Sequence, residues 1–248
     1  MSLRSTISTP EGKRRYVRTL FATIADRYDF ITVALSYGQD RRWKKRLINL
    51  AALTPRDRVL DLACGTGDLL FAAAGAGCPA VGLDVTLRML QLAKQKAEAL
   101  TATALNAAAL KTPVSFVTGD MVMLPFPDSR FTVVTTGYGL RNVPDLPAAV
   151  REIRRVLAPG GRLLSLDFNR PEGAWLRGAY LAYLTVVGAL LGLVLHRDPD
   201  TYRYIPESIR HYPGAAGVGR LLTEAGFTDV RVMTLLGGLM AIHTARRA

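Results

Sequence analysis

Short apolar runs alternate with longer segments of helical periodicity in the middle of the chain. A short apolar run bounded by charge or glycine is typical of a buried strand, whereas apolar positions three and four residues apart indicate a helix. Strands that alternate with helices form a parallel sheet with helices on both faces. We therefore predict strands at residues 58–62, 80–83, 114–117, 131–135 and 162–167, and helices at 66–74, 87–100 and 148–157.

The segments on either side of this alternation are predicted to be mainly helical. Helices at residues 12–27 and 40–53 are joined by a loop around 29–38, and residues 99–110 form the end of a helix plus a linker. Downstream we expect a helix at 179–195, a loop to about 213, a helix at 218–225, and two closing strands at 230–235 and 240–244. The last strand can enter the sheet antiparallel. The domain organisation is thus an N-terminal helical cap at 1–54 and an α/β domain at 55–248, with a helical insertion at 170–215.

The composition is that of a folded protein large enough to bury a full core. Among 248 residues, 49% are hydrophobic and 21% are charged, which excludes a disordered chain. Two cysteines, Cys64 and Cys78, make neither a disulfide framework nor a zinc spacing. No apolar run with a cleavage site follows the first residues, so a secretory signal is not expected and we predict a cytoplasmic protein.

Positive charge is concentrated at the N-terminus. Residues 1–46 hold eleven Lys and Arg against four Asp and Glu, which supplies more than half of the net charge of +12. Such a segment can be a solvated helix face, or it can meet an anionic membrane, an acidic partner or nucleic acid. Nucleic acid is disfavoured because neither a zinc finger nor an aromatic RNA-binding motif accompanies the basic residues.

An apolar segment at residues 179–195 is the second unusual feature. It has seventeen consecutive residues without a charge, interrupted by Gly188 and Gly192. A membrane span needs about 20 apolar residues, with about 17 as the lower limit. A buried or partner-facing helix, a helix that contacts a membrane or lines an apolar substrate tunnel, and a true span all remain open interpretations.

A glycine-containing loop follows the first strand and opens a helix. It spans residues 61–68, Asp-Leu-Ala-Cys-Gly-Thr-Gly-Asp, and Gly65 and Gly67 let a ligand approach the backbone closely. Such a loop lies at the carboxyl edge of the sheet, where this class of fold binds ligands. Asp84 ends the next strand, where a carboxylate can accept both hydroxyls of a ribose. The pattern fits NAD, FAD or S-adenosylmethionine.

The neighbouring residues favour the methyl donor. A dinucleotide site has a third glycine where this chain has Leu70. S-adenosylmethionine needs a carboxylate near its ammonium group, which Asp61 or Asp68 can supply. Asp120 can accept from an adenine amino group, and Met121 and Met123 can sandwich the ring.

The chain resembles the class I S-adenosylmethionine-dependent methyltransferases, and among them the ubiquinone/menaquinone biosynthesis C-methyltransferases of the UbiE/MenG type. The resemblance runs from about Val17 to His243 and is most specific at three motifs: Arg27-Tyr28-Asp29, Gly139-Leu140-Arg141-Asn142-Val143, and Gly237-Gly238 followed by Ala241-Ile242-His243. Further shared positions are Trp43-Lys44, the 59–68 loop, Leu124-Pro125-Phe126-Pro127-Asp128, the 155–163 segment, Tyr202 and Tyr204.

The chain departs from the family pattern at four positions. Thr32 stands in place of Asn, Asp40 in place of His, Gly137 in place of Ser, and Asp167 in place of Glu. None of these changes removes the cofactor site. The loss of the serine hydroxyl at Gly137 does remove one side-chain contact to the cofactor.

The resemblance implies a Rossmann-like, mostly parallel seven-stranded sheet and methylation of a ring carbon of a prenylated quinol. It implies S-adenosylmethionine as cofactor, no metal and a homodimer. The isoprenoid tail of such a substrate gives the apolar 179–195 segment and the basic N-terminus one explanation, so we expect peripheral membrane contact, and no nucleic acid. Arg141, Asn142 and Tyr28 are then the candidate catalytic residues, and Tyr202, Tyr204 and His243 the weaker substrate candidates. Cofactor-binding candidates are Tyr28, Asp61, Ala63, Gly65, Thr66, Gly67, Asp84, Val85, Asp120, Met121 and Gly137.

Three other functions compete with this interpretation. A methyltransferase for another phenol, amine or lipid would share fold and cofactor. A module that binds S-adenosylmethionine without catalysis is disfavoured by the intact set of Asp61, Asp84 and Arg141. A NAD-dependent oxidoreductase is disfavoured by Leu70 and by the closing strand pair.

Overall fold

A seven-stranded sheet forms the centre of the molecule. The computed structural model describes residues 3–102 and 110–248, and places the strands in the order β3-β2-β1-β4-β5-β7-β6. All neighbouring pairs are parallel except those made by β7, which runs antiparallel to both β5 and β6. The strands are β1 (Val59–Leu62), β2 (Ala80–Asp84), β3 (Val114–Thr118), β4 (Phe131–Gly137), β5 (Leu157–Phe168), β6 (Phe227–Leu235) and β7 (Met240–Arg247). The predicted seven-stranded, mostly parallel architecture is confirmed.

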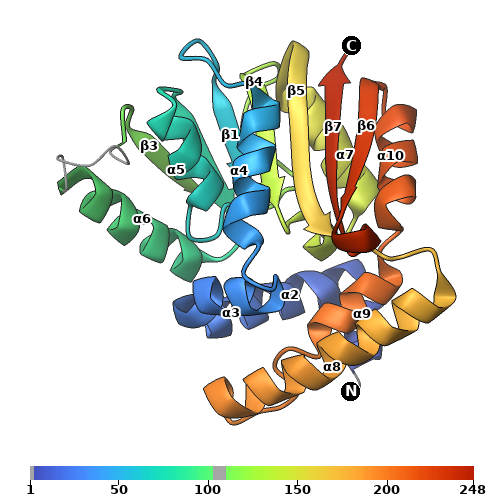
Figure 1. Ribbon diagram of the computed structural model, residues 1–248. Helices are drawn as coiled ribbons and strands as arrows, with labels where there is room; N and C mark the ends of the chain where they lie inside the picture. Colours follow the sequence, from blue (N-terminus) through green and yellow to red (C-terminus); the bar gives the residue numbers. More distant parts are fainter. Residues whose placement is uncertain (1–2, 103–109) are drawn as a thin grey trace.

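Helices cover both faces of the sheet. α4 and α5 pack on one face and α7 and α10 on the other, each through its own apolar cluster (Figure 1). The buried stripes follow the helical period, as with Val150 and Ile153 of α7. The bounds of these helices are α4 (Asp40–Ala51), α5 (Asp68–Gly75), α7 (Leu146–Val156) and α10 (Gly214–Glu224). A further helix, α6 (Leu87–Ala102), contacts β2 and β3.

A separate helical layer lies below the carboxyl ends of the parallel strands (Figure 1). It combines the N-terminal segment with the insertion that follows β5. Its elements are α1 (Leu3–Ile7), α2 (Pro10–Ile24), the 3-10 turn η1 (Ala25–Arg27), α3 (Tyr28–Leu35), α8 (Ala174–His196) and α9 (Tyr204–His211). Two further 3-10 turns, η2 (Leu140–Asn142) and η3 (Leu236–Gly238), follow β4 and β6.

Two segments predicted as loops are helices, so those predictions were wrong. Residues 29–38 contain α3, which buries Ile31 and Leu35 one turn apart. The segment before residue 213 contains α9, whose Tyr204 and Ser208 are likewise buried one turn apart. Both helices are only eight residues long, so their helical period is too short to stand out in the sequence. Tertiary packing stabilises them, because α3 contacts η1 and α4, and α9 contacts α8 and η2.

Element boundaries differ by a few residues elsewhere. α10 begins at Gly214, which has a positive φ of 75°, and β5 begins at Leu157 ahead of an irregularity in its pairing with β4. α8 extends the predicted apolar helix at its N-terminal end to Ala174. Of the predicted linker at 99–110, residues 103–109 lie outside the described residues.

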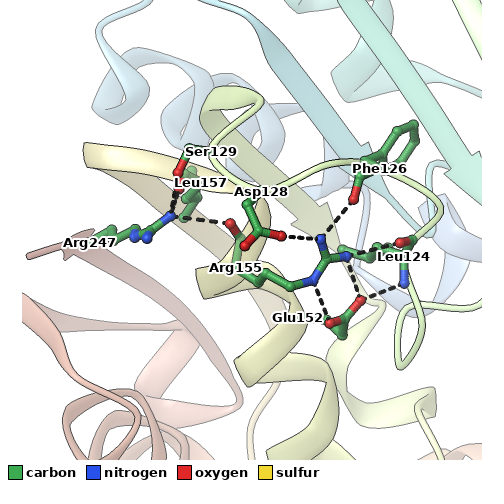
Figure 2. A network of polar contacts seen from close by, with 8 residues as sticks. All are labelled: Leu124, Phe126, Asp128, Ser129, Glu152, Arg155, Leu157 and Arg247. Atoms are coloured by element: carbon green, nitrogen blue, oxygen red, sulfur yellow. Dashed lines mark hydrogen bonds and ion pairs between the residues drawn. The ribbon is translucent and has the colours of Figure 1, made fainter.

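Arg155 of α7 fixes the loop that runs from the third strand to the fourth (Figure 2). Its guanidinium donates to the carboxylates of Glu152 and Asp128 and to the carbonyls of Leu124 and Phe126. Glu152 in turn accepts from the backbone N–H of Leu124 at 2.7 Å. The family motif at residues 124–128 is therefore a structural one, because its backbone and its aspartate are held by one arginine.

Candidate functional site

The glycine loop after β1 adopts the conformation that its sequence predicted. Gly65 and Gly67 have positive φ angles of 53° and 94°. A Cβ at Gly67 would lie 2.5 Å from the ring of Phe71, so any other residue there would also have to displace that ring. The carboxylate of Asp84 accepts the backbone N–H of Gly65 at 2.9 Å and that of Thr86 at 2.8 Å. Asp84 thus ties the loop to the end of β2.

Three cavities meet at the carboxyl edge of the sheet. Tyr28 of α3 and Tyr138, just after β4, line all three. We call them the Asp84 cavity, the Asp61 cavity and the Arg141 cavity, after a charged residue in the wall of each. The two tyrosines mark the junction where ligands in separate cavities can touch.

The Asp84 cavity lies between the sheet edge and helix α2. Arg14 of α2 closes one side through an ion pair with Asp120 at 2.7 Å. Met123 is 76% exposed and lies outside the lining, so only Met121 of the two predicted methionines faces the cavity. Other predicted cofactor residues in its wall are Tyr28, Ala63, Gly65, Asp84, Val85, Asp120 and Gly137.

The Asp61 cavity is smaller and strongly charged. Asp61 accepts a hydrogen bond from the Thr135 hydroxyl at 2.8 Å, and burial raises the pKa of its carboxyl to about 7 despite that bond. Lys44 of α4, Thr66 and Asp68 line the same space. Two charges of opposite sign therefore face a cavity that adjoins the Asp84 cavity.

The Arg141 cavity is largely apolar, with a buried polar group at one end. Arg141 is 4% exposed, its Nε faces Asp167 at 3.4 Å and its Nη1 contacts the Ser208 hydroxyl. Tyr202 and Tyr204 line this cavity, as predicted for substrate residues. Burial raises the pKa of Tyr204 above its usual range, so its hydroxyl stays protonated at neutral pH.

Three polar atoms in these walls are buried and have no hydrogen-bond partner in the described part of the chain. They are the hydroxyls of Thr86 and Tyr204 and the side-chain oxygen of Asn142. Thr86 lines the Asp84 cavity, Tyr204 the Arg141 cavity, and Asn142 both. Since unpaired buried polar atoms are costly, these three are suited to bind a ligand.

His243 is the predicted substrate residue that the structure places elsewhere. Its Nε2 lies 2.9 Å from the carbonyl of Ala215 and its Nδ1 lies 3.3 Å from the hydroxyl of Ser165. Burial lowers its pKa, so the ring is neutral at pH 7. Its position in β7 between α10 and β5 indicates a packing role.

The sequence did not single out two residues of the site. Lys44 belongs to a shared Trp-Lys pair, but in a basic helix it could not be distinguished from surface charge. Tyr138 has a positive φ of 62° and donates to Asp40 at 2.7 Å. The sequence feature that could have identified Tyr138 as a site residue is its position directly before the Gly139–Val143 motif.

The walls fit an adenosine-containing sulfonium amino acid. Asp84 offers a carboxylate beside the two glycines of the backbone loop, and Asp61 offers a buried carboxyl for an ammonium group. The Thr86 hydroxyl, which has no hydrogen-bond partner among the described residues, belongs to a residue in the wall of the Asp84 cavity. A model of the ubiE/COQ5 methyltransferase family matches residues 9–247. The chain belongs to this family.

Relatives in the ubiE/COQ5 family match almost the whole chain. It is 37% identical over 240 residues to the ubiquinone/menaquinone biosynthesis C-methyltransferase UbiE of Pseudomonas paraeruginosa, covering 95% of this chain and 91% of that protein. It is 38% identical over 230 residues to the demethylmenaquinone methyltransferase of Thermus thermophilus, covering 92% of this chain and all of that protein.

Solved structures agree on the fold of this ubiE/COQ5 family member. An S-adenosylmethionine-dependent methyltransferase of Thermotoga maritima superposes with a TM-score of 0.63 at 16% identity, covering 94% of this chain and all of that one. The protein is an S-adenosylmethionine-dependent methyltransferase.

Cofactor binding should release a proton near neutral pH. The folded pKa of Asp61, about 7, lies above its unfolded value of about 3.9, so the carboxyl is mostly protonated at pH 6. An ammonium group beside it favours the carboxylate, so binding expels the proton and affinity rises as pH increases toward 7. Calorimetry at pH 6.5 in two buffers of different ionisation enthalpy measures this release. Asp61→Asn should abolish it, and an unchanged proton release in that variant would contradict the assignment.

Proposed function

We propose that this protein transfers a methyl group from S-adenosylmethionine to a ring carbon of a prenylated quinol in menaquinone or ubiquinone biosynthesis. The observation that carries the proposal is the family match over residues 9–247, together with relatives named for this reaction. The structure adds an apolar cavity that adjoins the cofactor cavities and has a cation at one end.

The residues of the Arg141 cavity suit the activation of a quinol. Methylation at carbon requires electron density on the ring, which rises when a phenolic hydroxyl loses its proton to a water molecule that carries it to solvent. Arg141 holds a fixed positive charge that stabilises the oxygen as it becomes negative. It is not a base, because a guanidinium stays protonated at any working pH. Asp167 and Ser208 keep it oriented.

Asn142 and Tyr28 complete the arrangement. The partnerless oxygen of Asn142 can accept a hydrogen bond from a quinol hydroxyl and hold the ring in place. Burial raises the pKa of Tyr28 to about 12, so it remains a neutral phenol that excludes water at the junction of the cavities. S-adenosylmethionine, when bound, supplies an electrophilic methyl group on sulfur.

The test uses purified protein, S-adenosylmethionine and two reduced substrates. One is a short-chain demethylmenaquinol and the other a 2-methoxy-6-prenyl-benzoquinol, and mass spectrometry measures the gain of one methyl group on each. Methylation of either substrate supports the proposal and shows whether the protein acts on a naphthoquinol or a benzoquinol ring. Cofactor binding without methylation of either would overturn it, leaving a methyltransferase for another phenol, amine or lipid, or a cofactor-binding module.

We further propose that α8 brings the enzyme to the membrane that holds its substrate. By length and composition α8 could cross a membrane, but this property is weak evidence for a span. Its exposed face is apolar over several turns, with Val186 68% exposed, Leu190 60% and Val194 69%. Trp175, 84% exposed, stands at its N-terminal end. An exposed apolar stripe on a helix lying flat against the fold suits insertion at a lipid surface better than a span.

Acidic substitutions on α8 should release the protein from vesicles. We expect the double change Val186→Glu, Leu190→Glu to lower binding to anionic vesicles by about tenfold or more, because two apolar side chains worth about 1.5–3 kcal/mol each no longer partition. Sedimentation with vesicles measures this. The matched control is Leu87→Glu on α6, a leucine that is 59% exposed. Equal vesicle binding by the wild type and the double variant would contradict the proposal.

The basic N-terminal helix is a second contribution to that surface. Arg15 and Arg18 of α2 are exposed and have charge available for anionic lipid, so changing both to Glu should also weaken vesicle binding. Arg14 is unsuitable for this test because it pairs with Asp120 in the cofactor wall. A cytoplasmic location and a homodimer complete the proposal, and the homodimer is what the family resemblance implies. Light scattering of the purified protein tests the dimer.

A further inference from the structure

We propose that Lys44 recognises the carboxylate of the cofactor's amino-acid portion, and that Lys44 and Asp61 together make a receptor for a zwitterion. Cofactor binding does not depend on the methyl acceptor. Lys44 can therefore bind the cofactor carboxylate even if no quinol is methylated, and separate experiments test the two proposals.

The position of Lys44 supports this role. The Asp61 cavity adjoins the Asp84 cavity through Tyr28, Tyr138 and the backbone around Gly65, so one ligand can extend through both. Asp61 lies at the end of β1 and Lys44 projects from α4, and both line the smaller space. An α-amino acid carries an ammonium and a carboxylate on one carbon, which matches an anion and a cation in one small cavity.

Lys44 is held in place by an inner partner. Its Nζ lies 2.8 Å from Asp40 Oδ2, and the other oxygen of Asp40 accepts from the Tyr138 hydroxyl at 2.7 Å. Asp40 is 2% exposed, and it stands where the family pattern has His. The lysine is therefore pre-positioned by a buried carboxylate of this particular chain.

The outer partner of Lys44 is exchangeable. Nζ also lies 2.8 Å from Asp68 Oδ2, but the Asp68 side chain is 43% exposed and has Lys96 as a second cation at 3.9 Å. An ammonium group has three donors, and the two aspartates account for two of them. A ligand carboxylate can thus take the third donor or replace Asp68, whose charge remains compensated by water and Lys96.

Lys44 keeps its charge in this setting. Burial by itself would lower the pKa of Lys44, but the carboxylates of Asp68 and Asp40 outweigh burial and raise that pKa above its usual range. The residue therefore presents a permanent cation to the cavity. A charge-assisted hydrogen bond from such a cation is among the stronger polar contacts that a protein makes.

The experiment compares two ligands that differ only in the carboxylate. S-adenosylmethionine and its decarboxylated analogue are titrated by calorimetry into the wild type, Lys44→Met and Lys45→Met. The wild type should bind the complete cofactor about tenfold or more tightly than the analogue. Lys44→Met should lose about tenfold or more in affinity for the cofactor, keep its affinity for the analogue, and so bring the two dissociation constants within about threefold. Lys45 is the exposed neighbour on α4, so Lys45→Met is the matched control. This variant should leave the dissociation constants of both ligands unchanged.

Other patterns would overturn the proposal. A wild type that binds both ligands equally refutes it without any variant, and equal weakening of both ligands in Lys44→Met would show that the lysine only supports the fold. Asp61→Asn should weaken both ligands alike, because both carry the ammonium. Should Lys44→Met leave Asp40 unpaired and fail to fold, the double variant Asp40→Asn, Lys44→Gln removes both charges and is measured in its place.

Discussion

Asp84→Asn lowers the affinity for S-adenosylmethionine by about 100-fold or more. The aspartate accepts two backbone N–H groups at 2.9 and 2.8 Å and faces the cavity assigned to the adenosine. An asparagine amide turns one of these acceptors into a donor. One buried N–H then loses its partner, which costs about 1–3 kcal/mol, and the ribose hydroxyls lose a charged acceptor worth a similar amount. Calorimetric titration of the cofactor measures the loss.

The choice of ligands separates this effect from damage elsewhere. Methylthioadenosine keeps the ribose and lacks the amino acid, so Asp84→Asn should weaken it by about the same factor as the cofactor. Asp229→Asn, an exposed change on β6 far from the cavities, should leave both dissociation constants unchanged. A loss of less than about threefold in Asp84→Asn would show that ribose recognition lies elsewhere.

Arg141→Met reduces the methylation rate by about 100- to 1,000-fold while the cofactor dissociation constant changes by less than about threefold. The guanidinium faces the Arg141 cavity and is absent from the described linings of the other two, so its removal acts on the acceptor oxygen. The rate is measured in single turnovers with saturating cofactor. Arg141→Lys retains a positive charge but lacks the forked pair of donors. Its methylation rate should lie between those of the wild type and Arg141→Met.

Stability must be separated from catalysis in this variant. Removing Arg141 leaves Asp167 buried without its cation, and breaking a buried pair in this way costs about 3–5 kcal/mol. The double variant Arg141→Met, Asp167→Leu removes both charges and should regain most of the unfolding free energy, as urea titration would show. It should remain as slow as the single variant. Wild-type rates in a stable double variant would assign the arginine to the fold alone.

Sequence periodicity predicted the sheet well because buried parallel strands are short apolar runs. Each of the five parallel strands was found, and the glycine loop and Asp84 lie together at the carboxyl edge of the sheet, as the sequence predicted. The family motif also singled out Arg141 and Asn142, which both line the Arg141 cavity. These features depend on local sequence, so they can be interpreted without knowledge of the tertiary contacts.

The remainder depends on contacts between distant segments. α3 and α9 are too short to show a period, and their packing on neighbouring helices and 3-10 turns determines them. Lys44 was one of several basic residues in its helix, and only its placement beside Asp40 and Asp68 distinguishes it. His243 was part of a specific motif, yet the pairing of β7 with β5 turns it toward Ser165, because strand register decides which face a side chain occupies.

The division of the cavities between chain segments bears on how such enzymes diversify. Loops after β1, β2, β3 and β4 supply much of the walls of the Asp84 and Asp61 cavities, to which α2 and α4 add Arg14 and Lys44, whereas α2, α3 and α9 supply most of the wall of the Arg141 cavity. The acceptor-binding helices thus come from the start of the chain and from a single insertion between β5 and α10. Evolution can exchange those two stretches and leave the sheet intact. The same sheet would then still bind the methyl donor while the protein methylates a different acceptor. A chimera that takes both stretches from a relative should methylate the same ring as that relative.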